Sequence, residues 1–193
     1  MIAKSVTGPS DERYMKETKN NLKNEPAGRR KIILRAVAAA AVIAWMAVIF
    51  LLSAEEGEKS SHTSDIIVDA VVSVAEGVRL MEPEDATPEF RERLSFVVRK
   101  CGHAAEYAIL AVLTALALLA WGVRRAGMLA LIAWVWSVVY AATDEYHQLS
   151  VAGRAGQWRD VLIDAAGAAA GVIAFVLVLL IIRKHSGKRA RNA

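Results

Sequence analysis

Four long, unbroken apolar runs constrain this 193-residue chain more than any other feature of its sequence. Each is close to the roughly 20 residues that a helix needs to cross the hydrocarbon core of a bilayer. Inside lipid only helices and closed barrels satisfy the backbone, and runs of Ala, Leu, Val and Ile favour helices. The sequence therefore predicts an all-α, polytopic membrane protein with spans over about residues 32–53, 101–123, 126–143 and 161–182.

The remaining segments divide the chain into one membrane domain and two tails. Residues 1–28 are polar and mixed in charge, so we assign them no fold and expect a flexible cytoplasmic segment. Residues 29–184 form the predicted four-helix domain, and residues 185–193 form a basic cytoplasmic tail. The first span is too long for a signal-peptide core and lacks a small-residue cleavage site, which predicts a retained signal anchor. Since Cys101 is the single cysteine, no intrachain disulfide can form.

Lysine and arginine gather at one end of the spans, in residues 29–31, 124–125 and 183–191. The positive-inside rule then places both termini in the cytoplasm and loop 54–100 outside. These juxtamembrane residues account for the pI near 9.3. They are not interleaved with aromatic residues, so we predict a lipid bilayer as partner and no nucleic acid.

The outer loop carries one predicted helix of its own. Residues 66–78 are mostly apolar, with acidic and hydroxyl side chains at helical spacing, and they are too few to span a bilayer. We expect an amphipathic helix on the membrane interface, capped by Ser64 or Asp65. Residues 90–100 are expected to lead helically into the second span.

Ionisable residues crowd the end of the spans opposite the basic segments. Charge inside a span is costly, so such a cluster is a functional-site hypothesis by default. Asp160 and Asp164 lie one helical turn apart on a face that continues through Gly167 and Gly171, a ridge that lets a neighbouring helix approach closely. The predicted binding residues are Lys100, His103, Glu106, Tyr107, Asp144, Glu145, Gln148, Arg154, Asp160 and Asp164.

Two stretches of this cluster resemble the VanZ-like family of bacterial membrane proteins. The first, Lys100-Cys-Gly-His103-Ala-Ala-Glu106-Tyr107, is similar to the family's Lys-x-x-His-x-x-Glu-Tyr element. The second contains Asp144-Glu145-Tyr-His147-Gln148, then Gly153-Arg154, then Asp160-x-x-x-Asp164-x-x-Gly167, in the family's order. The chain departs from the family at Glu55, where Gln is more frequent, and at Asp164, where Asn is common.

The resemblance covers about residues 36–182 and implies an integral protein of the bacterial cell membrane. Some members are linked to resistance to glycopeptide antibiotics such as teicoplanin. The family supplies no settled reaction, so three hypotheses remain open.

In the first hypothesis an outward-facing pocket binds a lipid-linked or peptidoglycan-like envelope component. Arg154 and Lys100 would hold its phosphate or carboxylate, and Tyr107 would stack on it. In the second hypothesis the chain is a membrane-embedded hydrolase, and zinc or magnesium is considered as its metal. No His-Glu-x-x-His signature occurs, so no cofactor is assigned. The candidate catalytic residues are His103, Glu106, Asp144 and Glu145.

In the third hypothesis the charges only pair with one another across helix ends and fix the register of the bundle. Two groups of residues are expected to lie outside any site. His62 and His185 are interpreted as surface residues, whereas His147 is a weaker candidate for the cluster than His103, because it shares a helix side with Asp144 and Gln148 but sits off the family's recognisable positions. The aromatic side chains interpreted as a belt at the membrane interfaces are Trp121, Trp134, Trp136, Tyr140 and Trp158.

Overall fold

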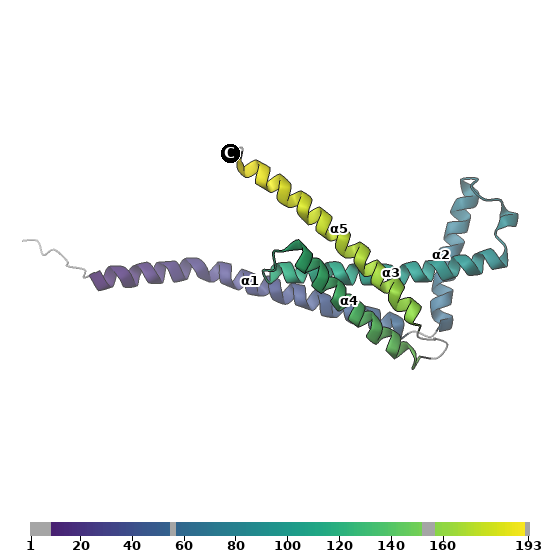
Figure 1. Ribbon diagram of the computed structural model, residues 1–193, viewed down its shortest axis with the longest axis horizontal. Helices are drawn as coiled ribbons and strands as arrows, with labels where there is room; N and C mark the ends of the chain where they lie inside the picture. The colour runs from purple at the N-terminus through teal and green to yellow at the C-terminus, as the bar shows by residue number, and fades with distance from the viewer. Residues whose placement is uncertain (1–8, 55–56, 152–156, 192–193) are drawn as a thin grey trace, which may run out of the picture.

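The computed structural model describes residues 9–54, 57–151 and 157–191, and it is helical almost throughout (Figure 1). No strand occurs in these ranges. The elements in chain order are α1 (Pro9–Ser53), α2 (Gly57–Gly77), the short 3-10 helix η1 (Pro83–Asp85), α3 (Pro88–Ala120), α4 (Ala126–Gln148) and α5 (Trp158–Arg191).

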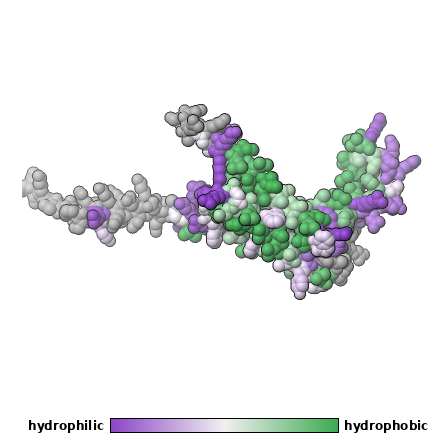
Figure 2. Space-filling model, viewed as in Figure 1, coloured by the Kyte–Doolittle hydropathy of each residue, from purple (hydrophilic) through white to green (hydrophobic). Residues whose placement is uncertain are grey.

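Four of these helices contain segments long and apolar enough to cross a membrane, as predicted. The segments are Gly28–Ser53, Pro88–Ala120, Ala126–Gln148 and Trp158–Gly187. The protein is therefore an all-α, multi-pass membrane protein. In Figure 2 apolar surface covers the region where the helices cross, and hydrophilic residues lie towards its ends.

Three helix boundaries differ from the sequence-based expectation. Helix α3 begins at Pro88, which confirms the helical lead-in expected for residues 90–100, but it ends at Ala120, where the second span was expected to reach 123. The third span was expected to end at 143, whereas α4 continues to Gln148. Helix α1 begins at Pro9, so the absence of a fold expected for residues 1–28 is wrong from Pro9 onwards. The costly step in forming a helix is its first turn. Once a span has formed, each further residue adds a backbone hydrogen bond without repeating that step, so the helix can continue into polar sequence.

Helix α3 is the centre of the bundle. It packs against α1, α2, α4 and α5, and Figure 1 shows α5 crossing it and then diverging towards the C-terminus. The core contains many small side chains, which let helix backbones approach closely in lipid. Its buried members are Ile49, Tyr107, Leu110, Ala111, Ala115, Ala133, Ala141, Ala168 and Val172.

The closest helix packing joins α3 to α5 through the predicted glycine ridge. A Cβ atom added at Gly167 would lie 2.7 Å from the carbonyl carbon of Ala104, and one at Gly171 would lie 2.8 Å from Cα of Ala108. Such separations are far below van der Waals contact, and backbone atoms cannot rotate away. The two glycines therefore fix the register between α3 and α5.

Helix α2 contains the predicted helix 66–78, but it begins earlier than expected. It starts at Gly57, so Ser64 lies inside the helix and the proposed cap at Ser64 or Asp65 is wrong. The polar residues before Ser64 continue the helix instead of ending it. Val68 and Val72 are buried, and Figure 1 shows α2 running across α3. An ion pair between Asp69 and Arg91 also ties α2 to α3.

The glycine ridge generates a stability prediction. Gly171→Leu should lower the free energy of unfolding in detergent by about 3 kcal/mol or more, because overpacking against a side chain already costs about 1–3 kcal/mol and here the neighbour is backbone. Gly187→Leu is the matched control, since nothing lies within 4 Å of a Cβ at that position of the same helix. Equal stability of the two variants, measured by denaturant titration, would show that the ridge does not hold α3 to α5.

Candidate functional site

An ion pair joins α3 to α5 at the end of the bundle where the acidic residues gather. Lys100 Nζ lies 2.5 Å from Asp160 Oδ2, and both side chains are about one-fifth exposed. The ammonium group also lies 5.4 Å from the ring centroid of Phe96. Lys100 is thus neutralised inside the protein, as the third hypothesis expects for charges at the helix ends in general. Its charge is committed to Asp160, which leaves it poorly placed to hold an anionic ligand.

Further from the helix ends than this pair, five of the predicted site residues are buried among α3, α4 and α5. Tyr107 is fully buried and Asp164 is 2% exposed, although the second is a carboxylic acid inside a span. Asp144, Glu145 and Gln148 of α4 are also buried. The residues that we call the polar cluster are His103, Tyr107, Asp144, Glu145 and Asp164.

Helical spacing and the register between helices bring the polar cluster together. Asp164 lies within electrostatic range of His103, Asp144 and Glu145. Tyr107 lies within range of both Asp144 and Asp164. Three helices therefore deliver these side chains to one place, although the sequence separates Tyr107 from Asp164 by more than fifty residues.

Hydrogen bonds within the chain satisfy only part of the cluster. Asp144 Oδ2 accepts a bond of 3.1 Å from the side-chain amide of Gln148. Glu145 Oε2 accepts a bond of 2.9 Å from the backbone N–H of Gln157, which fastens the start of α5 to α4. His103 Nδ1 and Glu106 Oε2 are 3.6 Å apart, a separation that suits an ion pair when the imidazole is protonated.

Within the described residues, several buried side-chain atoms form no hydrogen bond with the chain. An unsatisfied buried polar group costs roughly 1–3 kcal/mol, so native proteins contain few of them. Here they gather at one end of the bundle and come from α1, α3, α4 and α5. The atoms are Ser53 Oγ, Tyr107 OH, Asp144 Oδ1, His147 Nδ1 and Asp164 Oδ1.

Two of these atoms belong to residues outside the predicted binding set, namely His147, which the sequence made a weaker candidate, and Ser53. The ring of His147 packs 4.4 Å from that of Phe50 in α1, measured between centroids. His147 follows Asp144 by three residues and so shares its helix face, which was the available signal. Ser53 is the last residue of α1 and lies in a stretch, residues 50–64, that is similar to the family's serine-rich segment after its first span.

Three expectations for individual site residues need correction or fall outside the description. The ring of Tyr107 has no exposed surface and belongs to the apolar core, so its proposed role in stacking on a ligand is wrong. Its hydroxyl is the part that lies among the carboxylates. Arg154 and Glu55 lie outside the residues that the structure describes.

The aromatic residues of the middle of the bundle connect helices more than they form a belt. Tyr140 OH donates a 2.6 Å hydrogen bond to the carbonyl of Met46, and Trp134 Nε1 donates one of 3.0 Å to that of Ala165. Tyr140 and Trp134 therefore tie helices together, a role that the interpretation as an aromatic belt did not include. Trp45, which the sequence analysis did not single out, donates to the carbonyl of Glu106 and holds α1 against the site.

The candidate catalytic residues do not form a metal centre in this geometry. Among the described residues, no group of three or more His, Cys, Asp or Glu side chains is arranged to hold a metal ion. His103 and Glu106 contact each other, while Asp144 and Glu145 bond to Gln148 and Gln157. These carboxylates act as buried hydrogen-bond acceptors.

The unsatisfied hydroxyl of Tyr107 leads to a test by paired substitution. Tyr107→Phe should leave the free energy of unfolding unchanged or raise it, because the lost hydroxyl has no hydrogen bond with the described chain. Tyr140→Phe is the control, and it should lower that free energy by about 1 kcal/mol because it loses a bond to Met46. Thermal unfolding in detergent measures both. A larger loss for Tyr107→Phe would mean that its hydroxyl is bonded in the native protein.

A scan against protein-family models places this bundle in a family. The model described as VanZ/LLP1 matches residues 38–181, which is more than half of the chain. The match begins in α1 and ends in α5, so it includes the polar cluster and both stretches that resemble VanZ-like proteins. No curated protein and no solved structure matches the chain. The chain therefore belongs to the VanZ/LLP1 family.

Proposed function

We propose that the polar cluster binds the polar head of an envelope component, either lipid-linked or related to peptidoglycan. The observation that carries this proposal is the set of buried polar atoms without a hydrogen bond in the described chain, supplied by four helices to one end of the bundle. A group from outside the protein that donates hydrogen bonds would remove the cost of leaving Tyr107, Asp144 and Asp164 unsatisfied.

The charge balance of the cluster suggests which chemical groups such a ligand offers. Lys100 and Asp160 neutralise each other in their ion pair, so neither charge is left for a ligand. The carboxyl groups of Glu145 and Asp164 then lie within electrostatic range of the His103 imidazole and of the third acid, Asp144. Ionised carboxylates only accept hydrogen bonds. We therefore favour a head group rich in hydroxyl, amide or amino donors over a purely anionic one.

A cavity of about 470 Å³ lies between α2 and α3, and its lining on α3 precedes the cluster residues His103 and Tyr107 along the same helix. It contains Ser95 and Arg99 of α3, and Arg99 directly precedes Lys100. Helix α2 forms its other wall and exposes Ile66, Val71 and Val74 elsewhere on its surface. An amphipathic helix of this kind suits the membrane interface. The tail of a lipid-linked ligand would stay in the leaflet while its head reaches α3.

We place the protein in the bacterial cell membrane with both termini in the cytoplasm and the polar cluster facing outwards. The basic residues 29–31, 124–125 and 183–184 lie at the opposite end of the spans from the cluster. Basic residues near span ends are retained on the cytoplasmic side. A protein that holds an envelope component on the outer side lowers its free concentration. In this way it would contribute to resistance against teicoplanin-type glycopeptides.

The orientation is tested by labelling single cysteines in intact cells. In a Cys101→Ser background, cysteine at Glu84 should react with a membrane-impermeant maleimide, whereas cysteine at Gly187 should react only after lysis. Both positions are exposed in the structure, so reactivity reports the side of the membrane. The reverse pattern would turn the polar cluster towards the cytoplasm and end the proposal.

Binding is tested with purified protein and a lipid-linked peptidoglycan precursor. Asp144→Asn should weaken binding by about 10–100-fold, the equivalent of the roughly 1.5–3 kcal/mol of a hydrogen bond to a charged group. Glu84→Gln removes an exposed acid outside the spans and should leave binding unchanged. Binding can be followed by a fluorescence titration.

The same samples separate the three hypotheses. Product formed from the precursor, with or without added divalent metal, would favour the hydrolase. Stoichiometric binding without product supports the proposal. No binding, together with loss of stability in Asp144→Asn, would favour a purely structural cluster.

A further inference from the structure

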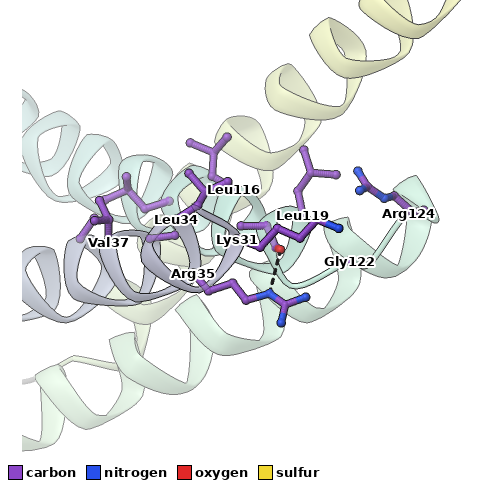
Figure 3. A pocket seen from close by; sticks show the side chains of 12 residues that line it. Lys31, Leu34, Arg35, Val37, Leu116, Leu119, Gly122 and Arg124 are labelled. Carbon is purple, nitrogen blue, oxygen red and sulfur yellow. Dashed lines mark hydrogen bonds between the residues drawn. The ribbon is translucent and has the colours of Figure 1, made fainter. Parts of the chain in front are cut away.

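A second hollow lies at the other end of the bundle, in the groove between α1 and α3. Its volume is about 660 Å³, within the range of about 300–1,000 Å³ typical of small-molecule sites. Leu34 and Val37 of α1 form one side, and Leu116 and Leu119 of α3 form the other (Figure 3). It lies at the basic ends of the spans, so it is separate from the polar cluster.

Three cations surround one end of this groove. Lys31 and Arg35 come from α1, and Arg124 follows the turn after α3 (Figure 3). Among the described residues that line the groove, none is acidic. The lining therefore combines a long apolar wall with a terminal charge of +3, counted as one Lys and two Arg.

The structure holds two of these cations in place through the end of α3. Arg35 Nε donates a 3.3 Å hydrogen bond to the carbonyl of Ala120, so its guanidinium sits at the last turn of α3. Gly122 has a φ of +102°, which favours glycine and turns the chain so that Arg124 faces the groove. The carbonyl of Arg124 accepts a 2.9 Å bond from Arg183 Nη1, which ties this turn to α5.

We propose that this groove binds one anionic phospholipid, with an acyl chain along the leucines and the phosphate beside the three cations. Leu34 is 58% exposed and Val37 is 60% exposed, and both lie in a membrane span, so lipid is their natural neighbour. Basic residues next to a span attract anionic head groups. Arginine forms forked hydrogen bonds to phosphate oxygens.

Two other occupants fit the groove less well. A second, parallel copy of the chain would bring its own basic segments, residues 29–31 and 124–125, to the same level of the membrane. Like charges would then face each other without compensation. A free phosphate would use the cations alone and leave Leu34, Val37 and Leu116 without a function in binding.

The experiment uses the purified full-length chain in a neutral detergent, with lipid retention measured by native mass spectrometry. Phosphatidylglycerol should bind at a ratio of one to one, whereas phosphatidylcholine and glycerol phosphate should bind weakly. The combined variant Lys31→Gln, Arg35→Gln, Arg124→Gln should lose on the order of 100-fold in affinity, at about fivefold for each cation.

The chain offers a matched control with the same change in charge. Arg29→Gln, Arg30→Gln, Arg125→Gln alters neighbouring basic residues that do not line the groove, and it should retain phosphatidylglycerol. Leu116→Trp keeps all three cations but fills the apolar wall, so it should lose the lipid without loss of charge.

Several results would overturn the proposal. These are equal retention of phosphatidylcholine, equal loss in the control and groove variants, lipid binding unaffected by Leu116→Trp, or a dimer in place of a lipid adduct. Glycerol phosphate binding as tightly as phosphatidylglycerol would reassign the cations to a soluble anion.

Discussion

The contact of α3 with α5 at Ala104–Gly167 and Ala108–Gly171 is the interaction on which the rest of the structure depends. In a bilayer the surrounding lipid is as apolar as the side chains, so helices associate through close packing and not through hydrophobic burial. Bare backbone on α5 permits that packing only in one register. In this register Lys100 meets Asp160, and Tyr107 comes close to Asp164.

The stability of the bundle does not explain why acidic side chains are buried in the polar cluster. A core of Leu and Ala at the same positions would avoid the cost of desolvating Asp144, Glu145 and Asp164, and replacing buried charges by apolar residues often stabilises a protein. The bundle nevertheless keeps these acids and leaves the Tyr107 hydroxyl unsatisfied within the described chain. Such an arrangement is typical of a site that completes its hydrogen bonds with a partner.

Sequence reasoning recovered the features that depend on one helix at a time. Apolar runs gave the four spans, and four-residue spacing placed Asp160, Asp164 and the glycines on one face. It did not identify the individual contacts that depend on the register between helices. The pairing of Lys100 with Asp160 and the tether from Tyr140 to Met46 are examples, since neither partner lies near the other in sequence. The groove beside Leu34 was missed for the same reason.

The length of α3 has a mechanical consequence. Its 33 residues extend roughly 50 Å at about 1.5 Å per residue, whereas the hydrocarbon core is roughly 30 Å thick. The helix is thus a rigid rod longer than the membrane, with α2 packed on one end and Arg35 bonded to Ala120 at the other. A tilt imposed on α2 would turn the rod about the contact at Ala104 and Ala108, so the Pro88 end and the Ala120 end of α3 would move in opposite directions. Binding at the α2 end and binding at the Ala120 end would therefore both act on the position of the same helix, α3.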